Sequence, residues 1–131
     1  MKDSVKLLRQ SGIQPTPQRV AIVDAVAGTT AHPTADEVFA SARRRCSTIS
    51  RATVYNTLSL LVEKKILCTQ ILKEGTVVYD PNVGRHHHFI DDETGTIVDI
   101  SWDKLIVTGK GNLANLEIRD YQVVLRGRKK K

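Results

Sequence analysis

The sequence predicts an α+β fold, in which an N-terminal winged helix-turn-helix domain is followed by a small C-terminal α/β domain. Two observations lead to this prediction. Apolar residues recur at helical spacing in four segments before residue 64. From residue 66 the apolar pattern changes to the period of two that is typical of strands. We expect a first domain at 1–80, a hinge at 81–85 that contains Pro81 and Gly84, and a second domain at 86–131.

The first three predicted helices are recognised by their start signals. Residues 3–10 form a short amphipathic segment with apolar side chains among charged ones. Thr16 is an N-cap and Pro17 occupies the first helical position of a second helix. Thr34 and Glu37 have the spacing of a capping box, which predicts the start of a third helix.

The fourth helix is the most informative of the set. Ser50 is its predicted N-cap, and Val54, Leu58, Leu61 and Val62 form one apolar face. A plain surface helix would show the same face, but the polar side chains near its N-terminus are those that a recognition helix places in a DNA major groove. These candidate DNA-binding residues are Arg51, Thr53, Tyr55 and Asn56.

A two-stranded hairpin follows this helix. Its predicted strands are residues 66–72 and 76–79, and Gly75 lies in the turn between them. Three helices, the last of which is the recognition helix, and the hairpin that follows them make a winged helix. Lys73, at the tip of the wing, is a further candidate DNA-binding residue because it can lie along a phosphate backbone.

Charge and hydropathy narrow the choice of partner. The chain has 131 residues and a formal net charge of +6, with a sequence pI of about 9.6, which favours a polyanion. Anionic membrane is the competing partner, but no apolar run approaches the roughly 20 residues of a spanning helix. Because no signal peptide precedes the first helix, we expect a cytoplasmic protein.

The second domain is predicted to be small and to contain mainly strands. About 45 residues bury too little surface to be stable alone, so we expect this domain to form a homodimer. Two DNA-reading domains would then face a pseudo-palindromic double-stranded operator. The predicted elements are strands at 86–90, 96–100 and 121–125 and a weak helix at 103–116, where Gly109 and Gly111 are unfavourable.

Three consecutive histidines indicate a metal site. In a strand, His86 and His88 lie on one face and His87 on the other, so the first two form a chelating pair. Asp80 and Asp99 flank the run and can add oxygen donors, and mixed imidazole and carboxylate ligands suit Fe(II) or Mn(II). A solvated polar strand is the alternative interpretation of the same residues.

The two cysteines indicate neither a disulfide framework nor a cysteine-based zinc site. Cys46 and Cys68 are isolated in the sequence, and we expect both to be ordinary buried thiols. No serine or cysteine nucleophile with a paired base is visible, so we expect a protein that is not an enzyme. A metallohydrolase and a metal-buffering protein are the alternatives from other functional classes.

Three segments together resemble the ferric uptake regulator (Fur) superfamily of bacterial metal-dependent repressors. They are His32–Glu37 (HPTADE), Ser50–Leu58 (SRATVYNTL) and the histidine strand, in the order of that family. The resemblance extends from Gly12 to Gly127. It implies an N-terminal DNA-binding domain, a C-terminal dimerisation domain and regulation of transcription by a bound metal ion.

The resemblance to the peroxide-responsive branch of this family, PerR, implies a regulatory site with five ligands. In that branch Fe(II) reacts with hydrogen peroxide, a ligand histidine is oxidised, and DNA binding falls. The oxidation-sensitive ligands would be His32 and His86. Aspartate at both carboxylate positions favours peroxide sensing, because iron-sensing members often place glutamate at one of them. The implied ligands of Fe(II) or Mn(II) are His32, Asp80, His86, His88 and Asp99.

One departure from the family changes the expected cofactors. Most members carry a CxxC pair of a structural zinc site where this chain has Asp91 and Thr94, so we expect no structural zinc. Haem-responsive iron regulators (Irr) share that absence and have a similar histidine motif, which keeps an iron- or haem-responsive regulator as the alternative. His87 would then serve a second metal or haem site, although we expect an exposed histidine. The residues expected to stabilise the dimer are Ile97, Ile100, Trp102, Val123 and Leu125.

Overall fold

The computed structural model describes residues 3–27, 32–73 and 75–130, without the side chains of residues 72 and 73. The chain divides into two compact units, Met1–Val83 and Gly84–Lys131. No helix in the described ranges is long and apolar enough to cross a membrane.

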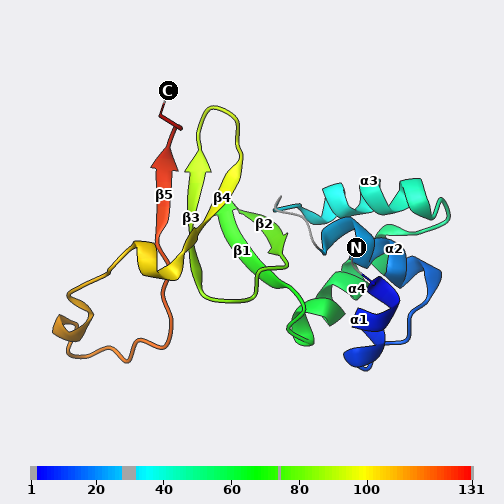
Figure 1. The fold of residues 1–131 in the computed structure, drawn as a ribbon, viewed down its shortest axis with the longest axis horizontal. Helices are drawn as coiled ribbons and strands as arrows, with labels where there is room; N and C mark the ends of the chain where they lie inside the picture. The colour runs from blue at the N-terminus through cyan, green and yellow to red at the C-terminus, as the bar shows by residue number, and fades with distance from the viewer. Residues whose placement is uncertain (1–2, 28–31, 74, 131) are drawn as a thin grey trace. The chain divides into compact units, whose positions relative to one another are not determined.

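The first unit is a winged helix. Four helices precede a two-stranded antiparallel hairpin, in the order that the sequence predicts (Figure 1). The elements are α1 (Ser4–Gln10), α2 (Pro17–Val26), α3 (Ala35–Arg45), α4 (Arg51–Glu63), β1 (Cys68–Lys73) and β2 (Thr76–Asp80).

Each helix of this unit starts at a side-chain cap. Thr16 and Ser50 accept hydrogen bonds from backbone N–H groups three residues further on, which satisfies donors that the helix itself leaves unpaired. The predicted capping box is confirmed, because Thr34 Oγ1 accepts from the Glu37 N–H and Glu37 Oε1 accepts from the Thr34 N–H. These bonds fix the start of α3, and His32 lies two residues before Thr34.

The core of the first unit joins all four helices. Leu8 of α1, Ile22 of α2 and Val38 of α3 are almost completely buried. On α4, Leu58 and Leu61 are buried in the same cluster. The buried face of α4 is therefore the predicted one, and the polar side chains at its N-terminal end remain at the surface. Val54 is buried with them and Val62 is half-buried.

The second unit contains a three-stranded sheet in the order β4-β3-β5 (Figure 1). The histidine strand is central, so β3 is paired on both sides. It runs antiparallel to β4 and parallel to β5. The strands are β3 (His86–Asp91), β4 (Ile97–Ser101) and β5 (Val124–Gly127).

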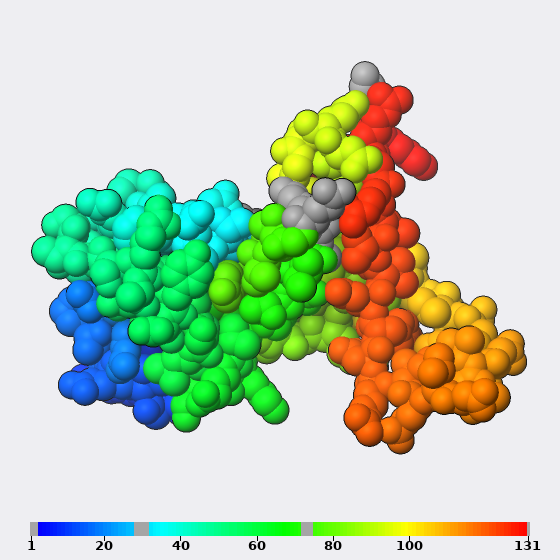
Figure 2. Space-filling view, turned by 180° about the vertical axis from the view of Figure 1, so that it is seen from behind, coloured from blue at the N-terminus to red at the C-terminus, as the bar shows by residue number. Residues whose placement is uncertain are grey.

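The predicted helix at 103–116 is wrong. Two short 3-10 turns, Trp102–Lys104 and Lys110–Asn112, replace it. Gly109 has a φ of 88°, a left-handed conformation that an α-helix does not accommodate. In Figure 2 this segment, in orange, extends away from the strands of its unit, and Ile106 is 87% exposed. The expected final strand also starts later, at Val124 instead of Tyr121.

Asp91 holds the turn between β3 and β4. Its Oδ1 accepts hydrogen bonds from the Glu93 N–H at 2.9 Å and the Thr94 N–H at 3.2 Å. Gly95 completes the turn with a φ of 77°. A buried carboxylate and backbone N–H groups therefore close this turn at the positions where the family resemblance places a cysteine pair.

Candidate metal centre and nucleic-acid interface

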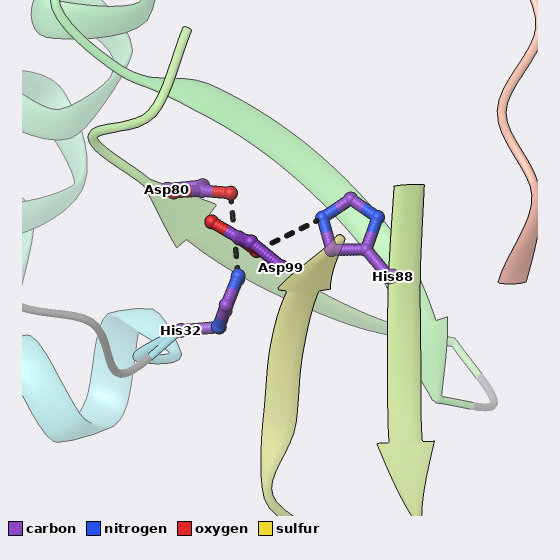
Figure 3. A group of neighbouring side chains, drawn as sticks. All are labelled: His32, Asp80, His88 and Asp99. Carbon is purple, nitrogen blue, oxygen red and sulfur yellow. Dashed lines mark ion pairs between the residues drawn. The ribbon is translucent and has the colours of Figure 1, made fainter. Parts of the chain in front are cut away.

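In the first unit, His32 and Asp80 form a buried pair. His32 Nε2 lies 3.2 Å from Asp80 Oδ2, and the two side chains are 2% and 4% exposed (Figure 3). The Tyr79 N–H donates to the Pro33 carbonyl oxygen at 2.8 Å, which ties the chain after His32 to the end of β2. Asp80 Oδ1 accepts from the Asn82 N–H at 2.9 Å, so the carboxylate is oriented from its other side.

In the second unit, two histidines share one carboxylate. Asp99 Oδ1 lies 3.6 Å from Nε2 of both His86 and His88. The imidazoles are 5% and 0% exposed, and Asp99 is directly opposite His88 in the β3–β4 register (Figure 3). The prediction that His86 and His88 lie on one face of a strand is therefore confirmed, because both reach the same oxygen.

A backbone contact orients the ring of His86 in a way that suits metal binding. Its Nδ1 lies 2.6 Å from the Gly84 carbonyl oxygen, which only accepts hydrogen bonds, so Nδ1 carries the proton. Nε2 is the ring nitrogen that faces Asp99. A hydrogen bond to the other ring nitrogen is the usual way in which a protein orients a metal-ligating imidazole.

The donor chemistry fits Fe(II) or Mn(II). Each unit presents imidazole nitrogen beside carboxylate oxygen, and no thiolate is part of either group. Such mixed nitrogen and oxygen ligands suit these two ions. The ligands of a structural zinc site, in contrast, are usually rich in cysteine. Burying so many imidazoles is costly unless each has a polar partner, and a metal ion would be a strong one.

His87 is on the opposite face of β3, as predicted, but the expectation of an exposed histidine is wrong. Its side chain is completely buried. The ring stacks on Trp102 with centroids 4.4 Å apart and an interplanar angle of 17°. His87 Nδ1 accepts a hydrogen bond of 2.9 Å from the Val123 N–H. The ring therefore holds together β3 and the chain that enters β5.

The two thiols differ from the expectation of buried cysteines. Cys46 and Cys68 are both half-buried, and neither is in a disulfide. Cys46 Sγ lies 3.8 Å from Thr48 Oγ1, and the Cys68 thiol donates to the Asn82 carbonyl oxygen at 3.5 Å. Each thiol thus has a weak local contact, and Cys46 also packs against the core of the first unit.

The N-terminal end of α4 is a polar surface. Arg51, Tyr55 and Asn56 are exposed, whereas Thr53 is half-buried and its hydroxyl accepts a hydrogen bond from the Ser50 hydroxyl. Three of the predicted DNA-binding residues of α4 are therefore available at the surface, and Thr53 is partly used in capping. The side chain of Lys73 lies outside the described part of the chain.

The wing lies close to this surface. Burial raises the pKa of the Tyr79 hydroxyl on β2, and the neighbouring Tyr55 hydroxyl on α4 raises it further. Tyr79 is therefore neutral at physiological pH, and its backbone is the segment that bonds to Pro33. One strand thus connects the recognition-helix surface with the His32–Asp80 pair.

Sequence reasoning missed one contact at this surface. Asp36 and Phe39, both on α3, hold the Arg51 side chain. Asp36 was visible only as an acidic residue in the first turn of a helix, and no local pattern pairs it with a residue 15 positions away. Only the packing of α3 against α4 brings them together.

A winged helix combined with paired histidines and aspartates defines the class of metal-responsive regulators. This chain belongs to the ferric uptake regulator family, whose model matches residues 10–126. It is 34% identical over 105 residues to the peroxide-responsive repressor PerR of Staphylococcus aureus (strain Mu50 / ATCC 700699), a match that covers 80% of this chain and 71% of the relative.

Solved structures of the family share the fold. The ferric uptake regulator of Pseudomonas aeruginosa with manganese has a TM-score of 0.70 at 22% identity, with 99% of this chain and 100% of that chain covered. The Vibrio cholerae ferric uptake regulator has a TM-score of 0.73 at 21% identity and coverages of 97% and 100%. The Campylobacter jejuni peroxide stress regulator has a TM-score of 0.65 at 21% identity and coverages of 99% and 98%.

Proposed function

We propose that this protein is a metal-dependent transcriptional repressor that senses hydrogen peroxide. The observation that carries the proposal is the presence, in each unit, of imidazole nitrogen within 3.2 to 3.6 Å of a carboxylate oxygen. The similarity to a peroxide-responsive repressor at 34% identity supports it. The proposed ligands of the regulatory metal are His32, Asp80, His86, His88 and Asp99.

The number of ligands supports a single metal that is shared by the two units. The first unit contributes two candidate ligands and the second contributes three. Neither set fills the coordination shell that Fe(II) or Mn(II) takes with oxygen and nitrogen donors. In the proposed function, the arrangement of the units that binds DNA is also the one with the higher affinity for metal. Metal binding therefore favours that arrangement and increases DNA binding.

Two ligand histidines are the proposed sites of oxidation by peroxide. The chemistry that Fe(II) supplies when bound is the reduction of hydrogen peroxide, with transfer of one oxygen atom to a ligand imidazole. His32 and His86 are the proposed oxidation-sensitive ligands. Both side chains are at least 95% buried, so bulk oxidants reach them poorly and modification depends on oxidant produced at the metal.

The proposed DNA surface is the exposed N-terminal end of α4 with the wing. Arg51, Tyr55 and Asn56 would contact bases or phosphates, with Thr53 and Lys73 in support. The net charge of +6 favours this partner. The second unit would form the homodimer that presents two such surfaces to a pseudo-palindromic operator in the cytoplasm.

The test of peroxide sensing is peptide mass spectrometry. Protein loaded anaerobically with Fe(II) is exposed to a stoichiometric pulse of hydrogen peroxide, and protein loaded with Mn(II) is the control. We expect addition of one oxygen to the peptides that contain His32 or His86 in the iron sample alone, together with loss of DNA binding. Unmodified histidines in both samples would contradict peroxide sensing and leave the iron level as the signal.

The DNA surface is tested by separating DNA binding from metal binding. Tyr55→Ala should weaken binding to the operator and leave Mn(II) affinity unchanged, because Tyr55 is exposed on α4 and is not a proposed ligand. Wild-type affinity should also fall steeply with salt, since neutralised phosphates release counterions. Equal operator affinity of the variant and the wild type would remove Tyr55 from this role.

The environment of His87 does not favour the haem-responsive alternative at that residue. Trp102 covers the ring face and Nδ1 is bonded to the Val123 N–H. A haem ligated by His87 would have to displace that packing. A metal-buffering protein would need no operator, so sequence-specific DNA binding that is lost on metal removal separates it from the proposed repressor.

A further inference from the structure

Two side chains of α3 fix the direction of the first residue of α4. Arg51 Nη1 lies 2.5 Å from Asp36 Oδ1. The Arg51 guanidinium carbon is 4.5 Å from the centroid of the Phe39 ring, on whose ring Arg43 also packs at 5.4 Å. A carboxylate and an aromatic ring therefore hold the guanidinium at the start of the proposed recognition helix.

This ion pair contributes little to folding. The Arg51 and Asp36 side chains are 60% and 69% exposed, and pairs of that kind add almost nothing measurable to stability. Its main physical effect is on orientation, because a guanidinium is planar and its N–H donors form a rigid fork. Asp36 occupies one terminal nitrogen and leaves further donors of the same fork for a nucleic acid.

We propose that Asp36 is a specificity-determining residue that positions Arg51 to read a guanine in the DNA major groove. This inference rests on the proposed function as a DNA-binding repressor. An arginine that is fixed in direction can make the bidentate contact to guanine O6 and N7, which is the commonest specific contact of this side chain. Arg51 is then a base reader, and Asp36 acts through it.

The charge of Asp36 adds a second contribution to specificity. A carboxylate at the DNA surface is repelled by phosphates, and it competes with them for Arg51. Both effects weaken binding to any sequence that lacks the matching guanine. Removing the charge should therefore tighten nonspecific binding, while the preference for one base pair declines.

The experiment compares base preference among four proteins loaded with Mn(II). Wild type first selects its duplex from a random-sequence library. The affinities of wild type, Asp36→Asn, Arg51→Lys and the charge-matched control Glu63→Gln are then measured on that duplex and on single G·C to A·T replacements within it. Glu63 is exposed at the other end of α4, so its replacement changes the net charge equally without touching Arg51.

We expect one base pair in each half-site at which wild type and Glu63→Gln prefer G·C by about tenfold or more. Arg51→Lys should lose that preference, because lysine cannot make the bidentate contact. Asp36→Asn should reduce the preference to less than about threefold and bind unrelated duplex more tightly than wild type. Helical content by circular dichroism should match wild type, because Thr34 and Glu37 form the cap of α3.

Two outcomes would overturn the proposal, and they are distinguishable. If wild type selects a sequence and Asp36→Asn keeps the full preference at the base pair that Arg51→Lys loses, Asp36 has no role in specificity and the repressor function stands. If wild type selects no sequence, the DNA-binding function fails, and the role of Asp36 fails with it.

Discussion

Replacing Asp99 by asparagine should remove most of the stabilisation that metal gives to this protein. The side chain is 30% exposed, and its Oδ1 lies 3.6 Å from Nε2 of both His86 and His88. Asparagine keeps the shape of aspartate but loses its negative charge and one oxygen acceptor. The substitution therefore alters the electrostatics of the candidate site and leaves its packing in place.

The size of the effect follows from linkage. Mn(II) at 100 times its Kd stabilises the folded wild type by about 2.7 kcal/mol. Loss of a partner in the outer shell of a metal site already weakens affinity by about 10- to 100-fold, and Asp99 is a proposed ligand. With a 100-fold weaker Kd, the same Mn(II) concentration stabilises the variant by only about 0.4 kcal/mol. For a chain of this size the metal-induced rise in Tm falls from roughly 10 °C to 1 or 2 °C.

The assay is thermal unfolding with and without Mn(II), together with isothermal titration of the ion. Asp92→Asn is the matched control, because Asp92 is an exposed aspartate in the same unit. The metal-free Tm values of wild type and both variants should be similar. A full metal-induced rise in Tm for Asp99→Asn would refute the assignment of Asp99 as a ligand.

Three further predictions concern the surroundings of the site. Thr34→Ala should lower the free energy of unfolding by about 1 kcal/mol and weaken Mn(II) binding, because the cap is lost. Thr34→Ser keeps the cap and should change neither quantity; urea unfolding and metal titration measure the two effects. His87→Phe should cost about 1 to 3 kcal/mol because the Val123 N–H loses its acceptor, and an unchanged urea midpoint would contradict this. The pKa of Tyr79 is raised in the folded state, so its contribution to the free energy of unfolding is fully present below pH 10 and is lost as pH rises through the folded pKa. Tyr79→Phe should remove that loss of stability, as measured by urea unfolding at alkaline pH.

The helices could be predicted because their signals are local. Thr34 and Glu37 cap α3 within one turn, and Ser50 starts α4 in the same way. The pairing of His86 with His88 was also predictable, since it needs only the period of a strand. The segment after β4 was not predictable in this way, because its apolar residues suggested a helix while the left-handed conformation at Gly109 prevents one.

The remaining features depend on residues that are distant in sequence. His87 is buried because Trp102 and Val123 cover it, and a strand pattern alone does not tell which face of β3 is covered. Asp36 meets Arg51 only through the packing of α3 against α4. The full ligand set came from the family resemblance and not from spacing, since His32 alone is an ordinary loop histidine before a helix.

The two groups of candidate ligands differ in how firmly they are held. His86 and His88 lie on the central strand of a sheet, and His87 between them is fixed by a stacked ring and a backbone hydrogen bond. His32 lies outside any helix or strand and depends on the capping box at Thr34 and the bond from Tyr79 to Pro33. The histidine strand is therefore preorganised, whereas the position of His32 costs more conformational entropy to fix. Metal affinity should accordingly be limited by the cap of α3, which is why Thr34→Ala is expected to weaken metal binding.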